Sequence, residues 1–522
     1  MRRFLCTVFL LVPLVYALMV AMAPRFRPDQ IGPYVLLALA IGIGLGWRQF
    51  RWPPRSFALV LIAAALLIPS AVISRAFGRV DMMSVLFHAD FGMEGATLHG
   101  LETEILQGTL AGLLIGAVLA LLAGLWGLRH RAILGLTLAV LAVNPALRFA
   151  AMSAVLPAVT SDLMDRMVEP TVLADPTARP DLLILYLEGT DRQYADPQRW
   201  QDLYAPLSAL AAEGTAFTRV GQIAGTGWSL AGMVASQCGV PVVPKGLLYR
   251  NNFEDLASFM PGVLCLGDVL HGLGYAQSYV VGGDRNFGGI AGFYNTHGIT
   301  RQIGLHEQRD LYPAAAFAAA RASWVLDDQM TFQTARAEFD MLLRRDGPIS
   351  LIIETIAPHG RMGILSRRCH DGITVTLSRD VRKVVSCLLD EAAAFLRAAR
   401  AAHRAQRPDQ PLFILILSDH ISHNPGLPDV GADYRGFNTA ILIGPGVPAG
   451  AVNARTGAMI DLYPTLLQAM GLSAPPHAAN LGRSLLADQP TATEAHGIAL
   501  LDRMIVSDVP LSRRIWAEPS AH

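Results

Sequence analysis

The segment LFILILSDH, residues 412–420, decides the fold of the larger part of this chain. It is an uninterrupted apolar run that ends in Ser418, Asp419 and His420. A strand that is apolar at every position is buried on both faces, which is typical of a parallel sheet covered by helices. Similar runs alternate with helical patterns, so we expect an α/β domain with a central, mostly parallel sheet. The other expected strands are 182–187, 276–281, 349–355 and 440–443, and the expected helices are 201–213, 330–344, 390–403 and 462–470.

Polar residues follow several of these expected strands. Glu188 follows LLILYL, Asp284 follows YVVGG, His359 follows ISLIIETIAP, and Asp419 and His420 follow LFILILS. In a parallel sheet the carboxyl ends of the strands meet at one edge, where binding sites form. A single polar strand end is more often only solvated, but the set, with Asp419 and His420 adjacent, favours a functional site.

The stretch GTGWSLAGMVASQ, residues 225–237, offers a nucleophile. Thr226 lies between two glycines, and a helical pattern begins just after it. Backbone N–H groups and the positive end of the helix dipole favour an alkoxide and a phosphate at such a position. The alternative is that Thr226 or Ser229 only caps the helix. Thr226 becomes the better candidate if Glu188, Asp419 and His420 converge on it.

The N-terminal part of the chain has a membrane composition. The whole chain is 52% hydrophobic and 16% charged, and the apolar excess is concentrated near the N-terminus. A membrane span needs ~20 apolar residues. The first segment could instead be a signal peptide cleaved after Ala23, but Pro24 and the spans that follow favour an uncleaved helix. We expect a transmembrane domain at 1–152, a linker at 153–180 and an external domain at 181–522, with five spans near 4–22, 34–47, 57–73, 110–128 and 132–151.

Arginines in the short loops predict the orientation. The side that holds the N-terminus carries more of them than the opposite side, which places the N-terminus in the cytoplasm. Five spans then place the C-terminal domain outside, on the side of the membrane opposite to the N-terminus. The formal net charge is zero, which argues against a nucleic-acid partner. The cytoplasmic arginines are 2, 3, 48, 51, 55, 129 and 131, and the opposite ones are 25, 27, 75 and 79.

Cysteine usage agrees with an external C-terminal domain. Cys6 lies in the first apolar segment, and Cys238, Cys265, Cys369 and Cys387 all lie in the C-terminal part. An even number there is typical of an oxidising compartment. Four cysteines allow three pairings, and we favour Cys238–Cys265 and Cys369–Cys387 because they close the shortest loops. The alternative is four free, buried thiols.

Several short motifs carry a family resemblance. The chain from roughly 180 to 490, with its multi-span N-terminal region, resembles the phosphoglycerol transferases that decorate periplasmic glucans. That family belongs with the lipoteichoic acid synthases in the sulfatase and alkaline-phosphatase superfamily, so the resemblance implies that fold for the external domain. The motifs are LYLEGTDR at 185–192, AGMVASQCGVP at 231–241, CLGD at 265–268, SRRC at 366–369, SDH at 418–420, IDLYPTLL at 460–467 and LGRSLL at 481–486.

The resemblance implies a catalytic metal site. It makes Thr226 the nucleophile and makes Glu188, Asp419, His420 and Thr226 the ligands of one divalent cation. Mn²⁺ is favoured, with Mg²⁺ or Zn²⁺ as alternatives.

The same resemblance implies substrate contacts. His359 would contact the phosphoryl group or the leaving oxygen, and Asp284 and Arg285 would contact the headgroup. Two positions depart from the family pattern: relatives often have His-Pro near His359, where this chain has Pro358-His359, and Trp228 is unexpected two places after Thr226.

The implied reaction is transfer of phosphoglycerol from phosphatidylglycerol to a periplasmic glucan. A covalent phospho-threonine forms, diacylglycerol leaves, and a glucan hydroxyl displaces the enzyme, which gives ping-pong kinetics. Two alternatives stay open: a phosphoethanolamine transferase acting on lipid A or glycans, and a non-catalytic membrane sensor on the same fold. A sulfatase is disfavoured, because no Cys/Ser-x-Pro-x-Arg motif occupies the nucleophile position.

Overall fold

The computed structural model divides the chain into two compact units. Among the residues that the structure describes, those between 1 and 148, together with 423 and 424, form the first unit, and the others between 159 and 518 form the second. The domain limits at 152 and 180 stay predictions. The structure describes residues 1–77 without 24, 25, 27, 29 and 30; 102–148 without 146; 159–243 without 174, 175 and 177; and 258–518 without 361, 371, 425, 426 and 428–435.

The first unit is helical. Three stretches are long and apolar enough to cross a membrane: Arg2–Met22, Arg55–Arg75 and Glu102–Trp126. Two further apolar helices, at 32–46 and 130–142, are shorter, so the described residues contain three to five apolar helices where five spans were predicted. The helices are α1 (Arg2–Met22), α2 (Gly32–Gly46), α3 (Ala58–Ala65), α4 (Leu67–Phe77), α6 (Glu102–Trp126) and α7 (His130–Ala142).

Two of the predicted spans differ from the helices in detail. The expected span at 57–73 consists of α3 and α4, which are separated at Leu66. The amide of Asn144 donates to the Leu66 carbonyl over 2.8 Å, and α7 ends just before Asn144.

Glycines allow α6 to pack closely on α4: a Cβ at Gly112 would lie 2.4 Å from Cγ1 of Ile68. Small residues at such contacts are typical of membrane helices.

The second unit contains an eight-stranded sheet in the order β14-β2-β13-β11-β1-β8-β4-β5. Neighbouring strands are parallel except where β13 pairs with β11 and β2. The predicted mostly parallel sheet is therefore confirmed. The strands are β1 (Asp181–Leu187), β2 (Thr215–Phe217), β4 (Ala276–Val281), β5 (Arg301–Ile303), β8 (Ile349–Glu354), β11 (Leu412–Ser418), β13 (Ala440–Ile443) and β14 (Ala451–Asn453).

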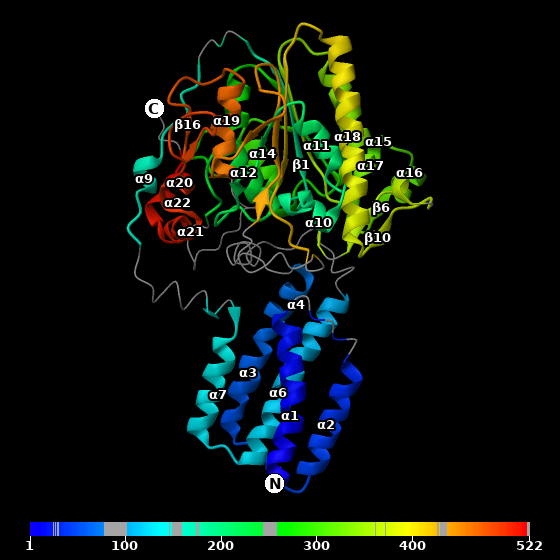
Figure 1. Ribbon diagram of the computed structural model, residues 1–522, viewed down its shortest axis with the longest axis vertical. Helices are drawn as coiled ribbons and strands as arrows, with labels where there is room; N and C mark the ends of the chain where they lie inside the picture. Colours follow the sequence, from blue (N-terminus) through cyan, green and yellow to red (C-terminus); the bar gives the residue numbers. More distant parts are fainter. Residues whose placement is uncertain are drawn as a thin grey trace. The chain divides into compact units, whose positions relative to one another are not determined.

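Helices cover both faces of this sheet (Figure 1). On one face, Leu183, Leu185 and Leu187 of β1 share a core with α11 (Ala205–Ala211), α17 (Asp328–Leu342) and α18 (Val381–Gln406). Since alternate residues of a strand point to opposite faces, this explains why the run 182–187 of β1 is apolar throughout. The other face is covered by α12 (Ser229–Cys238), α14 (Ile290–Thr296) and α19 (Leu462–Ala469).

The helix predicted at 201–213 was too long. Its first residue, Gln201, has a left-handed φ of 53°, and α11 begins only at Ala205. Pro206 lies in the first turn, where a proline stabilises a helix start. Conversely, α18 begins at Val381, before the predicted start at 390, because the side chain of Asp380 accepts a hydrogen bond from the backbone N–H of Lys383.

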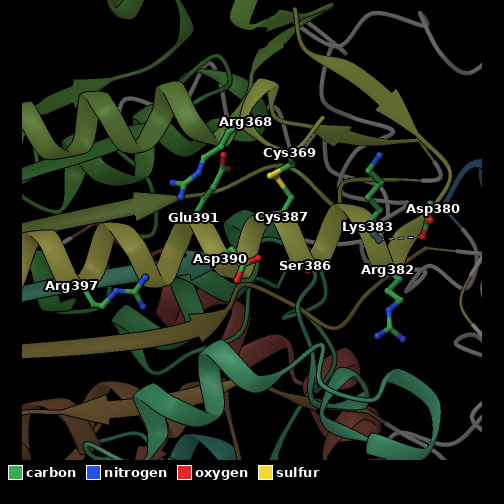
Figure 2. Close-up of a pocket in the computed structure, with 10 residues that line it drawn as sticks. All are labelled: Arg368, Cys369, Asp380, Arg382, Lys383, Ser386, Cys387, Asp390, Glu391 and Arg397. Carbon is green, nitrogen blue, oxygen red and sulfur yellow. Dashed lines mark hydrogen bonds between the residues drawn. A yellow bond between two sulfur atoms is a disulfide. The ribbon is translucent and has the colours of Figure 1, made fainter. Parts of the chain in front are cut away.

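Both predicted disulfides are present. Cys238 at the end of α12 is bonded to Cys265, and Cys369 is bonded to Cys387 of α18, with Cα–Cα distances of 4.1 and 5.8 Å. Figure 2 shows the second bond beside a hollow of about 660 Å³ that runs along α18. None of the metal ligands predicted from the sequence lines this hollow.

A buried carboxylate, that of Glu391, lines the same hollow (Figure 2). The Ser366 hydroxyl donates to its Oε2 over 2.9 Å. Burial, followed by repulsion from Asp328, raises the pKa of Glu391 to about 8. The folded protein therefore retains a proton on this group between about pH 4.5 and pH 8, where the unfolded chain has lost it. The free energy of unfolding therefore falls as the pH rises through that range.

We expect Glu391→Gln to stabilise the protein more at pH 8.5 than at pH 5. The difference in unfolding free energy should be at least about 1.4 kcal/mol, the equivalent of one pKa unit. The measurement is the melting temperature of the full-length protein in detergent at both pH values. Asp390→Asn, at the exposed neighbouring position of α18, is the matched control. Equal effects of Glu391→Gln at the two pH values would contradict the prediction.

Candidate active site

The structure brings Glu188, Asp419 and His420 together. Glu188 follows β1, and Asp419 and His420 follow β11, which pairs with β1 so that Leu187 lies opposite Ser418. One candidate ligand atom from each of the three residues lies within 4.8 Å of the other two. His420 Nε2 is 3.3 Å from Oε1 of Glu188 and 3.3 Å from Oδ2 of Asp419. All three side chains are buried.

Backbone contacts orient these groups. Oδ1 of Asp419 accepts from the N–H groups of Gly189 and His420, each over 2.8 Å. Oδ2 of Asp419 receives no hydrogen bond from the described residues. Nδ1 of His420 is 2.8 Å from the carbonyl oxygen of Ile421, to which it donates, so Nε2 is the nitrogen whose lone pair a cation would take in place of a proton. Two carboxylates and an imidazole lone pair directed at one point fit a divalent cation.

The electrostatics of the cluster also fit a cation. Burial and the neighbouring Asp419 raise the pKa of Glu188 to about 7. Burial lowers the pKa of His420, but Asp419 and Glu188 outweigh it and raise that pKa to about 10. Glu354 at the end of β8 adds another acid, whose pKa is raised to about 8 mainly by burial. Several buried acids with raised pKa values indicate a shortage of positive charge that a metal ion would supply.

Glu354 was not predicted from the sequence. It accepts a hydrogen bond from the Tyr279 hydroxyl, and the charges of Asp419 and Glu188 contribute to its raised pKa. Its signal in the sequence is a carboxylate at the end of an apolar strand, the same signal that identified Glu188. The predicted strand 349–355 includes Glu354, so the pattern did not distinguish this residue as a strand exit.

Ser229 is the hydroxyl that contacts the cluster. Helix α12 begins at Ser229, whose Oγ donates to Oε2 of Glu188 over 3.3 Å. The helix packs tightly there, since a Cβ at Gly232 would lie 1.7 Å from the Asp419 carbonyl oxygen. Trp228 is the N-cap residue and makes no side-chain capping bond. The sequence-based alternative in which Thr226 or Ser229 caps this helix is therefore wrong.

Thr226 does not directly precede the helix, although the sequence pattern predicted that it would. It lies three residues before α12, so the helix predicted to start just after it begins later. Its hydroxyl donates to the carbonyl oxygen of Ile223 over 2.8 Å and accepts from the N–H of Ile223 over 3.0 Å. The ligand and nucleophile roles of Thr226 stay predictions. Ser229, considered from the sequence only as a cap, is a hydroxyl that forms a hydrogen bond with Glu188.

The predicted substrate residues lie at the exits of β8 and β4. The ring of His359 packs edge-on against Trp324, with centroids 5.3 Å apart. Oδ2 of Asp284 is 3.2 Å from Nε2 of His306. Arg285 forms an ion pair with Glu307 at 2.8 Å. Since β8 is next to β1 in the sheet, these residues share an edge with Glu188, and their substrate contacts stay predictions.

Comparisons with known proteins agree with the motifs. No family model matches the chain. It is 30% identical over 316 residues to phosphoglycerol transferase I of Xanthomonas euvesicatoria pv. vesicatoria, which covers 59% of this chain and 43% of that protein. It is 30% identical over 259 residues to phosphoglycerol transferase I of Escherichia coli, covering 48% of this chain and 32% of that protein. This chain resembles phosphoglycerol transferase I. The resemblance predicted from the motifs is confirmed, although the chain spans less than half the length of these relatives.

Two solved structures were also found to be similar. The lipoteichoic acid synthase LtaP from Listeria monocytogenes is 13% identical with a TM-score of 0.46, covering 62% of this chain and 81% of that one. The lipooligosaccharide phosphoethanolamine transferase A (EptA) from Neisseria meningitidis is 12% identical with a TM-score of 0.47, covering 90% and 96%.

Proposed function

We propose that this protein transfers phosphoglycerol from phosphatidylglycerol to a periplasmic glucan. The observation that carries the proposal is the buried Glu188–Asp419–His420 cluster with the Ser229 hydroxyl against it. A nucleophile next to a cation site is the arrangement that phosphoryl transfer through a covalent intermediate requires. The relatives that the chain resembles are named phosphoglycerol transferase I, which supports transfer of this group.

The proposed first step breaks one ester bond of the donor. Oγ of Ser229 attacks the phosphorus, diacylglycerol leaves with a proton, and a phosphoglyceryl ester of Ser229 forms. The Ser229 proton points toward Oε2 of Glu188, and the N-terminal N–H groups of α12 favour the developing negative charge. In the second step a glucan hydroxyl attacks the phosphorus and its proton returns to Ser229. His359 would face the leaving oxygen.

The proposed metal site consists of Glu188, Asp419 and His420, completed by the nucleophile. A divalent cation bound there would lower the pKa of the hydroxyl and neutralise the phosphodiester. An oxygen-rich set with one imidazole suits Mn²⁺, which we favour, and also Mg²⁺ or Zn²⁺. Asp284 and Arg285 are the proposed headgroup contacts.

The proposed location is the bacterial inner membrane, with the N-terminus in the cytoplasm and the second unit in the periplasm. It is supported by the apolar helices of the first unit and by the two disulfides of the second. A periplasmic transferase has no ATP pool, so a membrane lipid is the natural source of the activated group.

The donor assay tests this function. We expect full-length protein with a divalent cation to release diacylglycerol from phosphatidylglycerol labelled in the headgroup, and to transfer the label to a purified periplasmic glucan. Phosphatidylethanolamine is the matched alternative donor. Release from phosphatidylethanolamine alone would favour the phosphoethanolamine transferase, and release from neither lipid would favour the non-catalytic sensor.

A further inference from the structure

Three aromatic rings meet beside the candidate active site. The Trp324 ring lies 5.3 Å from the His359 ring and 6.0 Å from the Phe287 ring, centroid to centroid. Each of the three side chains is partly exposed. They come from separate segments: Phe287 begins the 3₁₀ turn Phe287–Gly289 after β4, Trp324 lies in a hairpin, and His359 follows β8.

The hairpin holds Trp324 in place. Trp324 lies between β6 (Arg321–Ala322) and β7 (Val325–Leu326), directly after Ser323, whose φ is 57°. A left-handed conformation at a residue other than glycine is uncommon and marks a constrained turn. The backbone N–H of Leu326 donates to the Gly282 carbonyl over 2.9 Å, which ties the hairpin to the exit of β4. The Trp324 ring also lies over Gly283, where a Cβ would be 3.9 Å from Cζ3 of the indole.

Two ion pairs lie close to Phe287 in the fold. Asp284 and Arg285 follow β4 and precede Phe287 in the chain, and their partners His306 and Glu307 follow β5. A partly exposed aromatic surface with polar groups at its border suits a sugar ring, which has an apolar C–H face and hydroxyl groups at its rim. An acyl chain has no polar groups that could form hydrogen bonds with these charged side chains. The glycerol headgroup is small compared with an indole ring.

We propose that Trp324, supported by Phe287 and His359, is the platform on which a sugar ring of the acceptor stacks. This inference rests on the proposed function, because it assumes a glycan acceptor. It assigns the acceptor side of the site to the exits of β4 and β8. These exits are next to those of β1 and β11, where Ser229 contacts Glu188. Trp324 and Phe287 bind the acceptor and take no part in bond breaking, whereas His359 borders both the platform and the leaving oxygen.

The test is binding of a purified periplasmic glucan to the full-length protein in detergent, measured by calorimetry. Trp324→Ala should raise the Kd about tenfold, equivalent to about 1.4 kcal/mol. Trp324→Phe, which retains an aromatic surface, should stay within about threefold of wild type. Leu311→Ala removes an exposed apolar side chain of α15 (Leu305–Leu311) outside the platform and should leave the Kd unchanged. Melting temperatures verify that each variant is folded.

The contradicting outcomes are distinct. Equal glucan affinity of wild type and Trp324→Ala would overturn the platform alone. A raised KM for phosphatidylglycerol with an unchanged glucan Kd would assign the rings to the lipid donor and also overturn it. If wild type binds glucan through Trp324 but releases no diacylglycerol, the platform stands and the proposed transfer reaction fails.

Discussion

Ser229→Ala should lower diacylglycerol release from phosphatidylglycerol by at least about a thousandfold, because it removes the hydroxyl that contacts Glu188. Thr226→Ala should retain most of the activity. It removes hydrogen bonds to the backbone of Ile223 and should cost about 1 kcal/mol of stability. Single-turnover release by the two full-length variants, with melting temperatures as the folding control, provides the comparison.

A conservative variant and a direct observation sharpen this test. Ser229→Thr retains a hydroxyl at the start of α12 and should recover activity that Ser229→Ala lacks. Mass spectrometry of the quenched wild-type enzyme should find a phosphoglyceryl group on the peptide that contains Ser229. The opposite pattern, an active Ser229→Ala and an inactive but folded Thr226→Ala, would establish the nucleophile predicted from the sequence.

Asp419→Asn should remove the bound divalent cation and lower the rate about a thousandfold or more. The amide retains one oxygen to accept from the N–H groups of Gly189 and His420, so the local backbone is preserved. It replaces the second carboxylate oxygen, which receives no hydrogen bond from the described residues, by a group that cannot bind a cation. Elemental analysis of the purified full-length protein measures the metal directly.

Asp461→Asn is the matched control for that experiment. Asp461 is also buried, and it accepts from the backbone N–H groups of Ala458 and Arg483 outside the cluster. Its variant should retain the metal even if it lowers stability. Full metal content in Asp419→Asn would exclude Asp419 as a ligand, and metal loss in both variants would indicate a general loss of structure.

Much of the fold followed from local patterns. Apolar runs such as 182–187 and 412–417 predicted buried parallel strands, since only a strand covered on both faces is apolar at every position. Their polar exits predicted Glu188 and the Asp419–His420 pair, because parallel strands end at a common edge. Composition predicted the apolar helices of the first unit. The cysteine pairing followed from loop length, which is also a property of the chain alone.

The errors came where the backbone departs from a simple periodicity. The stretch 225–228, Gly-Thr-Gly-Trp, contains two glycines, and its sequence did not show that α12 begins only at Ser229. In the packed structure Gly232 lies against the Asp419 carbonyl, a residue far away in the chain. That contact holds α12 beside the cluster, where the Ser229 hydroxyl reaches Glu188.

The sequence by itself therefore determined the class of fold, the polar residues Glu188, Asp419 and His420 at the strand exits and the favoured pairing of the cysteines, because these depend on residue type, period and spacing. The tertiary structure decided the contact of Ser229 with Glu188, the approach of Glu354 to the cluster and the contact of Trp324 with His359. Each of these depends on the order of β11, β1, β8 and β4 in the sheet, which brings distant segments to one edge. Strand order is a property of the whole packed chain, and no local pattern encodes it.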